Sequence, residues 1–279
     1  MTSGVPRWRY PGRRLLRLLR ISQNPLSAVS LLAGRDPEWQ SDFRIGRLVL
    51  TARRTDIGAI ADVAIEDDYH FIRGLPFPGA HALILDIGAN IGCFAALVFS
   101  ICPAAEVHSV EPSPDTFALL ASNRDRYRAL RWHVHQSAIA ATGGTLCFRN
   151  DGLSPSRKLS TGWDGIPVTA EAFDVFVSRV AQGRRVFLCK MDIEGTEVAI
   201  FSGTMNILAD IDHFVVEVHG PSANTDLVNA RLSNAFHNVQ LVPGRVSTKP
   251  LIHAWRDRPA QGQNPRKAER PPNRISLTA

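Results

Sequence analysis

Long apolar runs and paired cysteines are both missing from this chain of 279 residues. The longest apolar stretch, Ile91 to Cys102, falls short of the roughly 18–20 residues that a membrane-spanning helix needs. The four cysteines show no CxxC spacing and lie in apolar surroundings. We therefore expect no membrane span, disulfide framework or cysteine zinc site, and we interpret the cysteines as reduced thiols of a cytoplasmic protein.

Basic residues outnumber acidic ones, but their excess is confined to the two ends of the chain. Residues 1–20 carry six arginines and no acid, and residues 256–279 carry six basic and two acidic residues. Residues 21–255 hold the remaining 20 basic and 24 acidic residues, a net charge of −4. A protein that binds nucleic acid usually has a basic patch on its folded surface. We consequently regard nucleic acid as an unlikely partner.

Both ends are predicted to lie outside the main domain, which we assign to residues 41–256. Residues 1–40 form a basic N-terminal segment, in which residues 12–22 have an arginine face and a leucine face if they are helical. We favour docking of the leucine face on the main domain. The alternative is a weak contact of residues 7–20 with an anionic membrane surface. Residues 257–279 are rich in proline and charge, which predicts a disordered basic tail.

Short apolar runs alternate with longer helical stretches across the main domain. The expected strands are 82–86, 106–112, 131–140, 145–150, 185–192, 211–220, 237–243 and 250–256, and the expected helices are 91–101, 115–123, 170–180, 194–208 and 223–236. This alternation predicts an α/β fold whose mostly parallel sheet is covered by helices on both faces.

Glycines gather in LILDIGANIGCF, residues 83–94, where the first predicted strand passes into a helix. Glycine permits a sharp turn and the close approach of a ligand, and ligands of open α/β sheets bind at the carboxyl ends of the strands. A dinucleotide site would show GxGxxG, whereas here Asp86 stands two residues before Gly88. A carboxylate there would repel a pyrophosphate, so we expect a cationic or amine-bearing ligand instead of NAD.

The second predicted strand ends in Glu111 and Pro112, 23 residues after Gly88. An acid at this position can accept hydrogen bonds from both hydroxyls of an adenosine ribose. Glu111 taken alone would be interpreted as an ordinary exposed carboxylate. Because it follows the glycine loop, we favour the ribose interpretation.

Together with later motifs, these features resemble the FkbM-type family of S-adenosylmethionine-dependent methyltransferases. The resemblance covers residues 82–220 and is carried by DIGANIG, VEPSPDTFALLASN, the Ser137–Ala138 strand end, KMDIEGTE and VVEVHG. It implies a class I methyltransferase (Rossmann-like) fold, with a seven-stranded sheet and an antiparallel last strand. It also implies methyl transfer from S-adenosylmethionine to a hydroxyl of a sugar, polyketide or other small metabolite.

The resemblance also assigns cofactor-binding residues by position. Residues of the glycine loop would surround the amino-acid end of the cofactor: Asp86, Gly88, Ala89, Asn90 and Gly92. Glu111, followed by Pro112, would hold the ribose, and Ser137 and Ala138 would lie near the adenine.

Four residues that follow the later strands are candidates for the chemistry: Lys190, Asp192, Glu194 and His219. Methyl transfer to a hydroxyl requires the acceptor to be oriented and its proton to be removed. Asp192, at a strand tip, is our first choice for the base, followed by Glu194, which we expect to begin the next helix. His219 could accept a proton at neutral pH. A purely structural network of these groups is the alternative.

Metal binding is not predicted. Asp192, Glu194 and Glu217 offer oxygen ligands of the kind that Mg²⁺ prefers, but three acids near one site are too few to predict it. His133 and His135 share a strand face without a third ligand nearby in sequence. We interpret these two histidines as packing or surface residues.

Two other functions remain open at this point. An RNA methyltransferase would also place a lysine and an aspartate such as Lys190 and Asp192 in a strand, although the acidic body and the lack of an aromatic, basic platform count against it. A non-catalytic scaffold that binds S-adenosylmethionine at a membrane surface is the second alternative.

Overall fold

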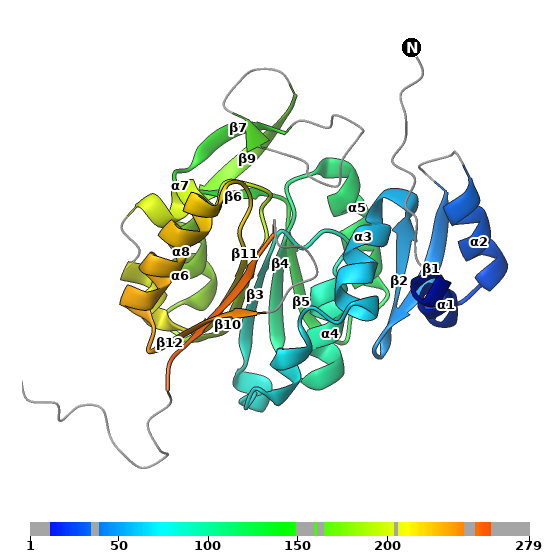
Figure 1. The fold of residues 1–279 in the computed structure, drawn as a ribbon, viewed down its shortest axis with the longest axis horizontal. Helices are drawn as coiled ribbons and strands as arrows, with labels where there is room; N and C mark the ends of the chain where they lie inside the picture. Colours follow the sequence, from blue (N-terminus) through cyan, green and yellow to red (C-terminus); the bar gives the residue numbers. More distant parts are fainter. Residues whose placement is uncertain are drawn as a thin grey trace, which may run out of the picture.

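Figure 1 shows a central sheet with helices on both of its faces, and a small sheet and a helical pair at its periphery. The computed structural model describes residues 12–34, 39–148, 159–160, 165–203, 206–242 and 249–257. Residues 1–11, much of the polar segment 150–165 and the predicted tail beyond residue 257 lie outside the described residues.

Seven strands form the central sheet, in the order β12-β13-β11-β10-β3-β4-β5. Their bounds are β3 (Leu83–Ile87), β4 (Glu106–Val110), β5 (Arg131–His135), β10 (Val186–Met191), β11 (Ile211–Glu217), β12 (Asn238–Val242) and β13 (Leu251–Trp255). Neighbouring strands from β5 to β11 run parallel, and β13 runs antiparallel to both β11 and β12. The predicted α/β class I methyltransferase fold, with its antiparallel last strand, is confirmed.

Helices cover both faces of this sheet: α4 (Cys93–Ile101), α5 (Pro114–Asp125), α6 (Phe173–Ala181), α7 (Glu197–Ser202) and α8 (Ser222–Ala235). Helices α4 and α5 share one core with Ile84 and Leu188, whereas α6, α7 and α8 share the other with Leu85 and Cys189. Successive residues of a strand point to opposite faces. The continuous apolar runs of β3 and β10 therefore supply both cores, and all their side chains are buried.

The N-terminal residues form two helices and a hairpin, α1 (Gly12–Ile21), α2 (Pro25–Ala33), β1 (Gln40–Ile45) and β2 (Leu48–Arg53). Leu18 of α1 is fully buried in the core that contains α4. The Arg17 guanidinium donates a hydrogen bond to the Ile65 carbonyl oxygen at 2.9 Å. The leucine face of α1 thus docks on the main domain, as we favoured, whereas the hairpin was not predicted.

Short helical turns connect the hairpin to the central sheet: η1 (Arg54–Asp56), α3 (Ile57–Ile60), η2 (Ala61–Ile65), η3 (His70–Gly74) and η4 (Gly79–His81). A second sheet, in the order β6-β9-β7-β8, is also new: β6 (Ala138–Ala140), β7 (Gly144–Phe148), β8 (Leu159–Ser160) and β9 (Ile166–Ala172). The prediction that a helix begins at Ala170 was wrong, because Val168 and Ala170 pair with β7 and pack in the core of this sheet.

The helix predicted over residues 194–208 is shorter and divided. Glu194 and Gly195 have φ angles of +56° and +113°, so the chain turns before α7 begins at Glu197. A second helical turn, η5, spans Asn206–Asp210. The expectation that Glu194 begins a helix was therefore wrong, since its backbone is left-handed.

The four cysteines are free and buried, in agreement with their interpretation as core thiols. Within the described part of the chain, none of the helices has the length and apolar character that crossing a bilayer requires.

Gly88 is a position where the backbone of a neighbouring segment leaves no room for a side chain. Its φ is +78°, and a Cβ there would lie 1.7 Å from the Asp192 carbonyl oxygen.

We expect Gly88→Ala to lower the free energy of unfolding by about 3 kcal/mol or more, because the backbones of Gly88 and Asp192 are fixed by the neighbouring strands β3 and β10. Gly58→Ala is the control, since Gly58 lies in α3 with open space around it, and its effect should stay within about 1 kcal/mol. Equal urea midpoints for the two variants would contradict this account.

Candidate functional site

The loop between β3 and α4 is fixed above the end of β4. The backbone N–H groups of Gly88 and Ala89 both donate to the Val110 carbonyl oxygen, at 3.0 and 2.9 Å. Asn90 and Gly92 follow with φ angles of +50° and +96°. A Cβ on Gly92 would lie 2.5 Å from the Trp132 ring. The glycines are therefore required by close packing as well as by the turn.

Glu111 lies directly beside this loop, after β4. Its carboxylate accepts hydrogen bonds from the backbone N–H of Asn90 at 3.1 Å and of Ser113 at 2.9 Å. These bonds fix the orientation of the side chain, which is 7% exposed. The ribose role of Glu111 and the place of Pro112 beside it stay predictions.

Ser137 and Ala138 lie close to Glu111 in the fold. The Glu111 N–H donates to the His135 carbonyl oxygen at 3.1 Å, so the end of β5 adjoins the end of β4. The Ser137 hydroxyl lies 3.1 Å from the carbonyl oxygens of both Ala138 and Thr169 and ties this turn to β9. The predicted ribose and adenine neighbourhoods are thus adjacent, although the contacts of Ser137 are internal.

Asp86 and Lys190 form a buried pair beneath the loop. The Lys190 ammonium donates to the Gly88 carbonyl oxygen at 2.7 Å and lies 3.5 Å from Asp86 Oδ1 and 3.7 Å from Asp192 Oδ2. Burial alone would lower the pKa of Lys190, but the Asp86 and Asp192 carboxylates outweigh it and raise this pKa. Asp86 is fully buried, so it acts on the loop through Lys190. This geometry indicates that Lys190 positions the glycine loop.

His219 is the centre of a cluster of four carboxylates. Its Nδ1 donates to Glu197 Oε1 at 2.8 Å, and the Glu197 side chain is completely buried. Its Nε2 lies 3.2 Å from Glu217 Oε1, 3.3 Å from Glu194 Oε2 and 3.8 Å from Asp192 Oδ1. The structure therefore brings together three of the four predicted catalytic residues around one imidazole.

The pKa values of Asp192 and His219 are shifted to different ranges in this cluster. Burial lowers the pKa of a histidine, but here the hydrogen bonds to Glu197 and Glu217 and the neighbouring carboxylates outweigh it and raise the pKa of His219 to about 10. Burial raises the pKa of Asp192 to about 7 despite the nearby Lys190. The role of His219 as a base stays a prediction, and its raised pKa, which favours a protonated imidazole at neutral pH, counts against it. Of these two groups, Asp192 has the pKa closer to neutrality.

Lys249 belongs to the cluster and was missed by the sequence analysis. Its ammonium lies 3.4 Å from Glu217 Oε1 and 3.5 Å from Glu194 Oε1. It precedes β13, and Leu251 of that strand pairs with Glu217. An antiparallel last strand begins at the edge where its parallel neighbours end. The predicted strand direction was therefore the signal that could have identified Lys249.

Acceptor atoms remain available at this edge of the sheet. Asp192 Oδ1 and Glu194 Oε2 are buried and make no hydrogen bond. Buried oxygens of this kind are costly unless a ligand or water satisfies them. Together with His219 these residues also place their ligand atoms within 4.8 Å of one another, a spacing that could admit a metal ion. In the structure the imidazole instead serves as their cationic partner.

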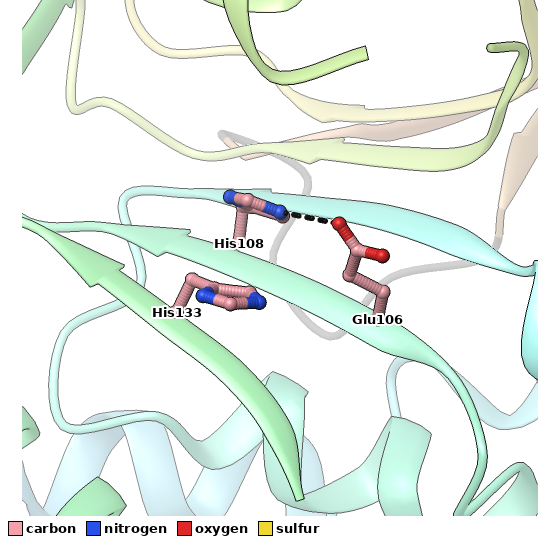
Figure 2. A group of neighbouring side chains, drawn as sticks. All are labelled: Glu106, His108 and His133. Carbon is pink, nitrogen blue, oxygen red and sulfur yellow. Dashed lines mark hydrogen bonds and ion pairs between the residues drawn. The ribbon is translucent and has the colours of Figure 1, made fainter. Parts of the chain in front are cut away.

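A second histidine cluster lies on β4 and β5. Figure 2 shows the His133 ring stacked against His108, which faces Glu106 on the same strand. His108 is the third ligand that the sequence analysis did not find beside His133 and His135, and His108 Nδ1 lies 3.0 Å from His135 Nε2. Glu106, however, is held by the guanidinium groups of Arg131 and Arg184.

The hydrogen bond from the Arg184 guanidinium holds the pKa of Glu106 well below its usual range, and His108 and Arg131 lower this pKa further. Arg131 and Arg184 also line a hollow of about 440 Å³ next to η4. Two guanidinium groups on the same carboxylate would repel a metal cation there. The interpretation of His133 and His135 as packing or surface residues stays a prediction.

Comparison with known proteins gives one family. The sequence model described as "Methyltransferase FkbM domain" matches residues 86–239, more than half of the chain. The hexuronic acid methyltransferase AglP of Haloferax volcanii is 28% identical over 140 residues, 49% of this chain and 56% of that protein. The 31-O-demethyl-FK506 methyltransferase FkbM of Streptomyces tacrolimicus is 28% identical over 172 residues, 49% of this chain and 65% of that protein.

The chain thus spans less than two thirds of the length of either relative. Among solved structures, an S-adenosylmethionine-dependent O-methyltransferase from Thermotoga maritima aligns with a TM-score of 0.44 and 12% identity, covering 75% of this chain and 72% of that one.

We expect His219→Asn to lower the free energy of unfolding at pH 8 by about 3–5 kcal/mol, because it leaves buried carboxylates without their cation. His219 has a raised pKa, so its contribution is complete below its unfolded pKa of 6.5 and is lost as the pH rises through about 10. Urea unfolding of the wild type and the variant should therefore converge between pH 8 and pH 11.

The control is His237→Asn, since His237 is exposed beside Asp257, and its effect should stay within about 0.5 kcal/mol. A stability difference for His219→Asn that does not change with pH would show that the imidazole is neutral in the folded protein.

Proposed function

The chain belongs to the FkbM methyltransferase domain family, and from this premise we propose that it methylates a hydroxyl group of a small metabolite such as a sugar or polyketide. S-adenosylmethionine is its cofactor. The substrates named for the two relatives, a hexuronic acid and 31-O-demethyl-FK506, support a small acceptor. The net charge of −4 on residues 21–255 counts against RNA.

The residues of the site fit the cofactor. Gly88 and Gly92 allow the loop after β3 to turn tightly, and two backbone N–H groups fix the Glu111 carboxylate beside this loop. Asp192 Oδ1 and Glu194 Oε2 lack hydrogen bonds in a cluster of carboxylates, an environment that favours a cationic sulfonium. When bound, the cofactor supplies the electrophilic methyl group.

The observation that carries O-methylation is the state of Asp192. Its carboxylate lies just beyond the tip of β10, has one oxygen without a hydrogen bond, and has a pKa raised to about 7 by burial. A base whose pKa lies near the working pH removes a hydroxyl proton most effectively. Two neighbouring groups with pKa values pushed apart, here Asp192 and His219, indicate separate acid–base roles.

In this mechanism each residue has one task. Asp192 accepts the proton of the acceptor hydroxyl, and Glu194 orients that hydroxyl with its unbonded Oε2. His219 keeps its proton and holds the carboxylates at fixed positions. Lys190 links the glycine loop to Asp192, so that cofactor and base keep a constant separation.

The four free, buried thiols support a reducing, cytoplasmic setting for this reaction.

Cofactor binding is tested by calorimetric titration of S-adenosylmethionine and S-adenosylhomocysteine. We expect micromolar binding to the wild type and a loss of about 10- to 100-fold in Glu111→Ala, because charged hydrogen bonds to the ribose are removed. Glu171→Ala, which removes a carboxylate paired with Arg179 on the surface, should bind like the wild type. A folded wild type that binds neither compound would contradict the cofactor site.

The base is tested by the pH dependence of S-adenosylhomocysteine release, with acceptors screened from hydroxylated sugars and macrolides. We expect kcat/KM to rise as Asp192 ionises and to level off above pH 7, in line with its pKa of about 7. Asp192→Asn should lose about 10²–10⁴-fold in kcat and the pH dependence with it. Full activity of Asp192→Asn would exclude it as the base, and the structural interpretation of the network would then hold.

A further inference from the structure

Exposed apolar side chains are concentrated at one end of the molecule. Of the eight large hydrophobic residues exposed in the described part of the chain, five lie between residues 15 and 39: Leu15, Leu16, Leu26, Val29 and Trp39. The other three, Ile166, Val175 and Leu241, lie on three separate elements, β9, α6 and β12. Single exposed apolar residues are normal on a protein surface, but a group of them indicates an interaction site.

Helix α2 supplies the most exposed part of this group. Its sequence, PLSAVSLLA, contains no charged residue. Leu26 is 81% exposed and Val29 is 47% exposed, whereas Ala28 is fully buried. The helix is well formed, because the Asn24 side chain accepts a hydrogen bond from the Ser27 N–H and caps it. Figure 1 shows α2 beside β1 at the outer edge of the molecule. Among the residues that the structure describes, none covers the Leu26 and Val29 side chains of this uncharged helix.

Helix α1 adds both apolar and basic residues to the same end. Leu18 anchors the helix in the core, while Leu16 is 58% exposed and Leu15 is 36% exposed. Residues 12–34, which contain both helices, carry four arginines and no acid. Residues 21–255 as a whole are net acidic. A net positive charge therefore occurs in the segment that carries the exposed apolar side chains, whereas residues 21–255 taken together are net negative.

We propose that the surface formed by α1 and α2, hereafter the α1–α2 surface, docks on an anionic membrane surface. Leu16, Leu26 and Val29 would enter the boundary between headgroups and acyl chains, and the net positive charge of residues 12–34 would attract acidic headgroups. The acidic main domain would be repelled by the same headgroups. This charge asymmetry orients the protein with the α1–α2 surface toward the lipid.

A second copy of the chain fits this surface less well. A symmetric dimer places the same surface of both subunits in contact. That arrangement would bring two arginine-rich segments without compensating acids against each other. Anionic lipid satisfies both the apolar and the basic residues, so it is the occupant that the charges favour.

Co-sedimentation of the full chain with vesicles tests the proposal. We expect binding to phosphatidylcholine vesicles that contain about 30% phosphatidylserine, at least about tenfold weaker binding to pure phosphatidylcholine, and release at high salt. The double variant Leu26→Glu/Val29→Glu should bind the anionic vesicles at least about tenfold more weakly than the wild type. Leu241→Glu is the matched control, because Leu241 is 54% exposed on β12, away from both helices. It should bind like the wild type.

Three outcomes would overturn the proposal. The first is no binding of the wild type to anionic vesicles. The second is binding that Leu26→Glu/Val29→Glu leaves unchanged, which would show general attraction of a basic chain. The third is a wild-type dimer in sedimentation velocity that the double variant dissociates, which would make a second copy the occupant. Circular dichroism of each variant confirms that it is folded, as the high exposure of both side chains predicts.

Discussion

The imidazole of His219, which lies among four carboxylates, organises the edge of the sheet where the parallel strands end. The Glu197 carboxylate is completely buried and has no contact with solvent. Its ion pair with the His219 imidazolium offsets the free-energy cost of burying this charge. The same imidazolium faces Glu217, Glu194 and Asp192 within 3.8 Å. It thereby links the loop after β10, the start of α7 and the end of β11. Without its charge, Glu197 would lose its ion-pair partner, and only Lys190 and Lys249 would balance the other three carboxylates.

The glycine loop and the acidic cluster form one mechanical unit. The Asp192 N–H donates to the Ile87 carbonyl oxygen at 3.0 Å, and Gly88 leaves room for the Asp192 backbone. Lys190 then connects the Gly88 carbonyl oxygen to the carboxylates on either side. Parallel neighbours β3 and β10 place these groups at the same height. The proposed base and the glycine loop are therefore held in register by adjacent strands.

Local patterns in the sequence were sufficient for the central sheet and for much of the site. Buried strands show as apolar runs, and Gly88, Glu111 and Asp192 follow directly from strand ends. The small sheet was not predicted, because β9 pairs with β7 and the residues between these two strands show no clear pattern of apolar and polar positions. Lys249 and the charge of His219 were missed for a related reason. Both depend on contacts between residues far apart in the sequence, such as His219 with Glu197.

The charge of His219 is the central claim, and nuclear magnetic resonance of its imidazole nitrogens tests it most directly. With ¹⁵N-labelled histidine, and His219→Asn to assign the signals, both ring nitrogens of His219 should show the shifts of a protonated imidazolium at pH 7.5. They should change only as the pH approaches about 10. Shifts of a neutral tautomer at pH 7.5 would contradict the account, because His219 would then be free to act as the base.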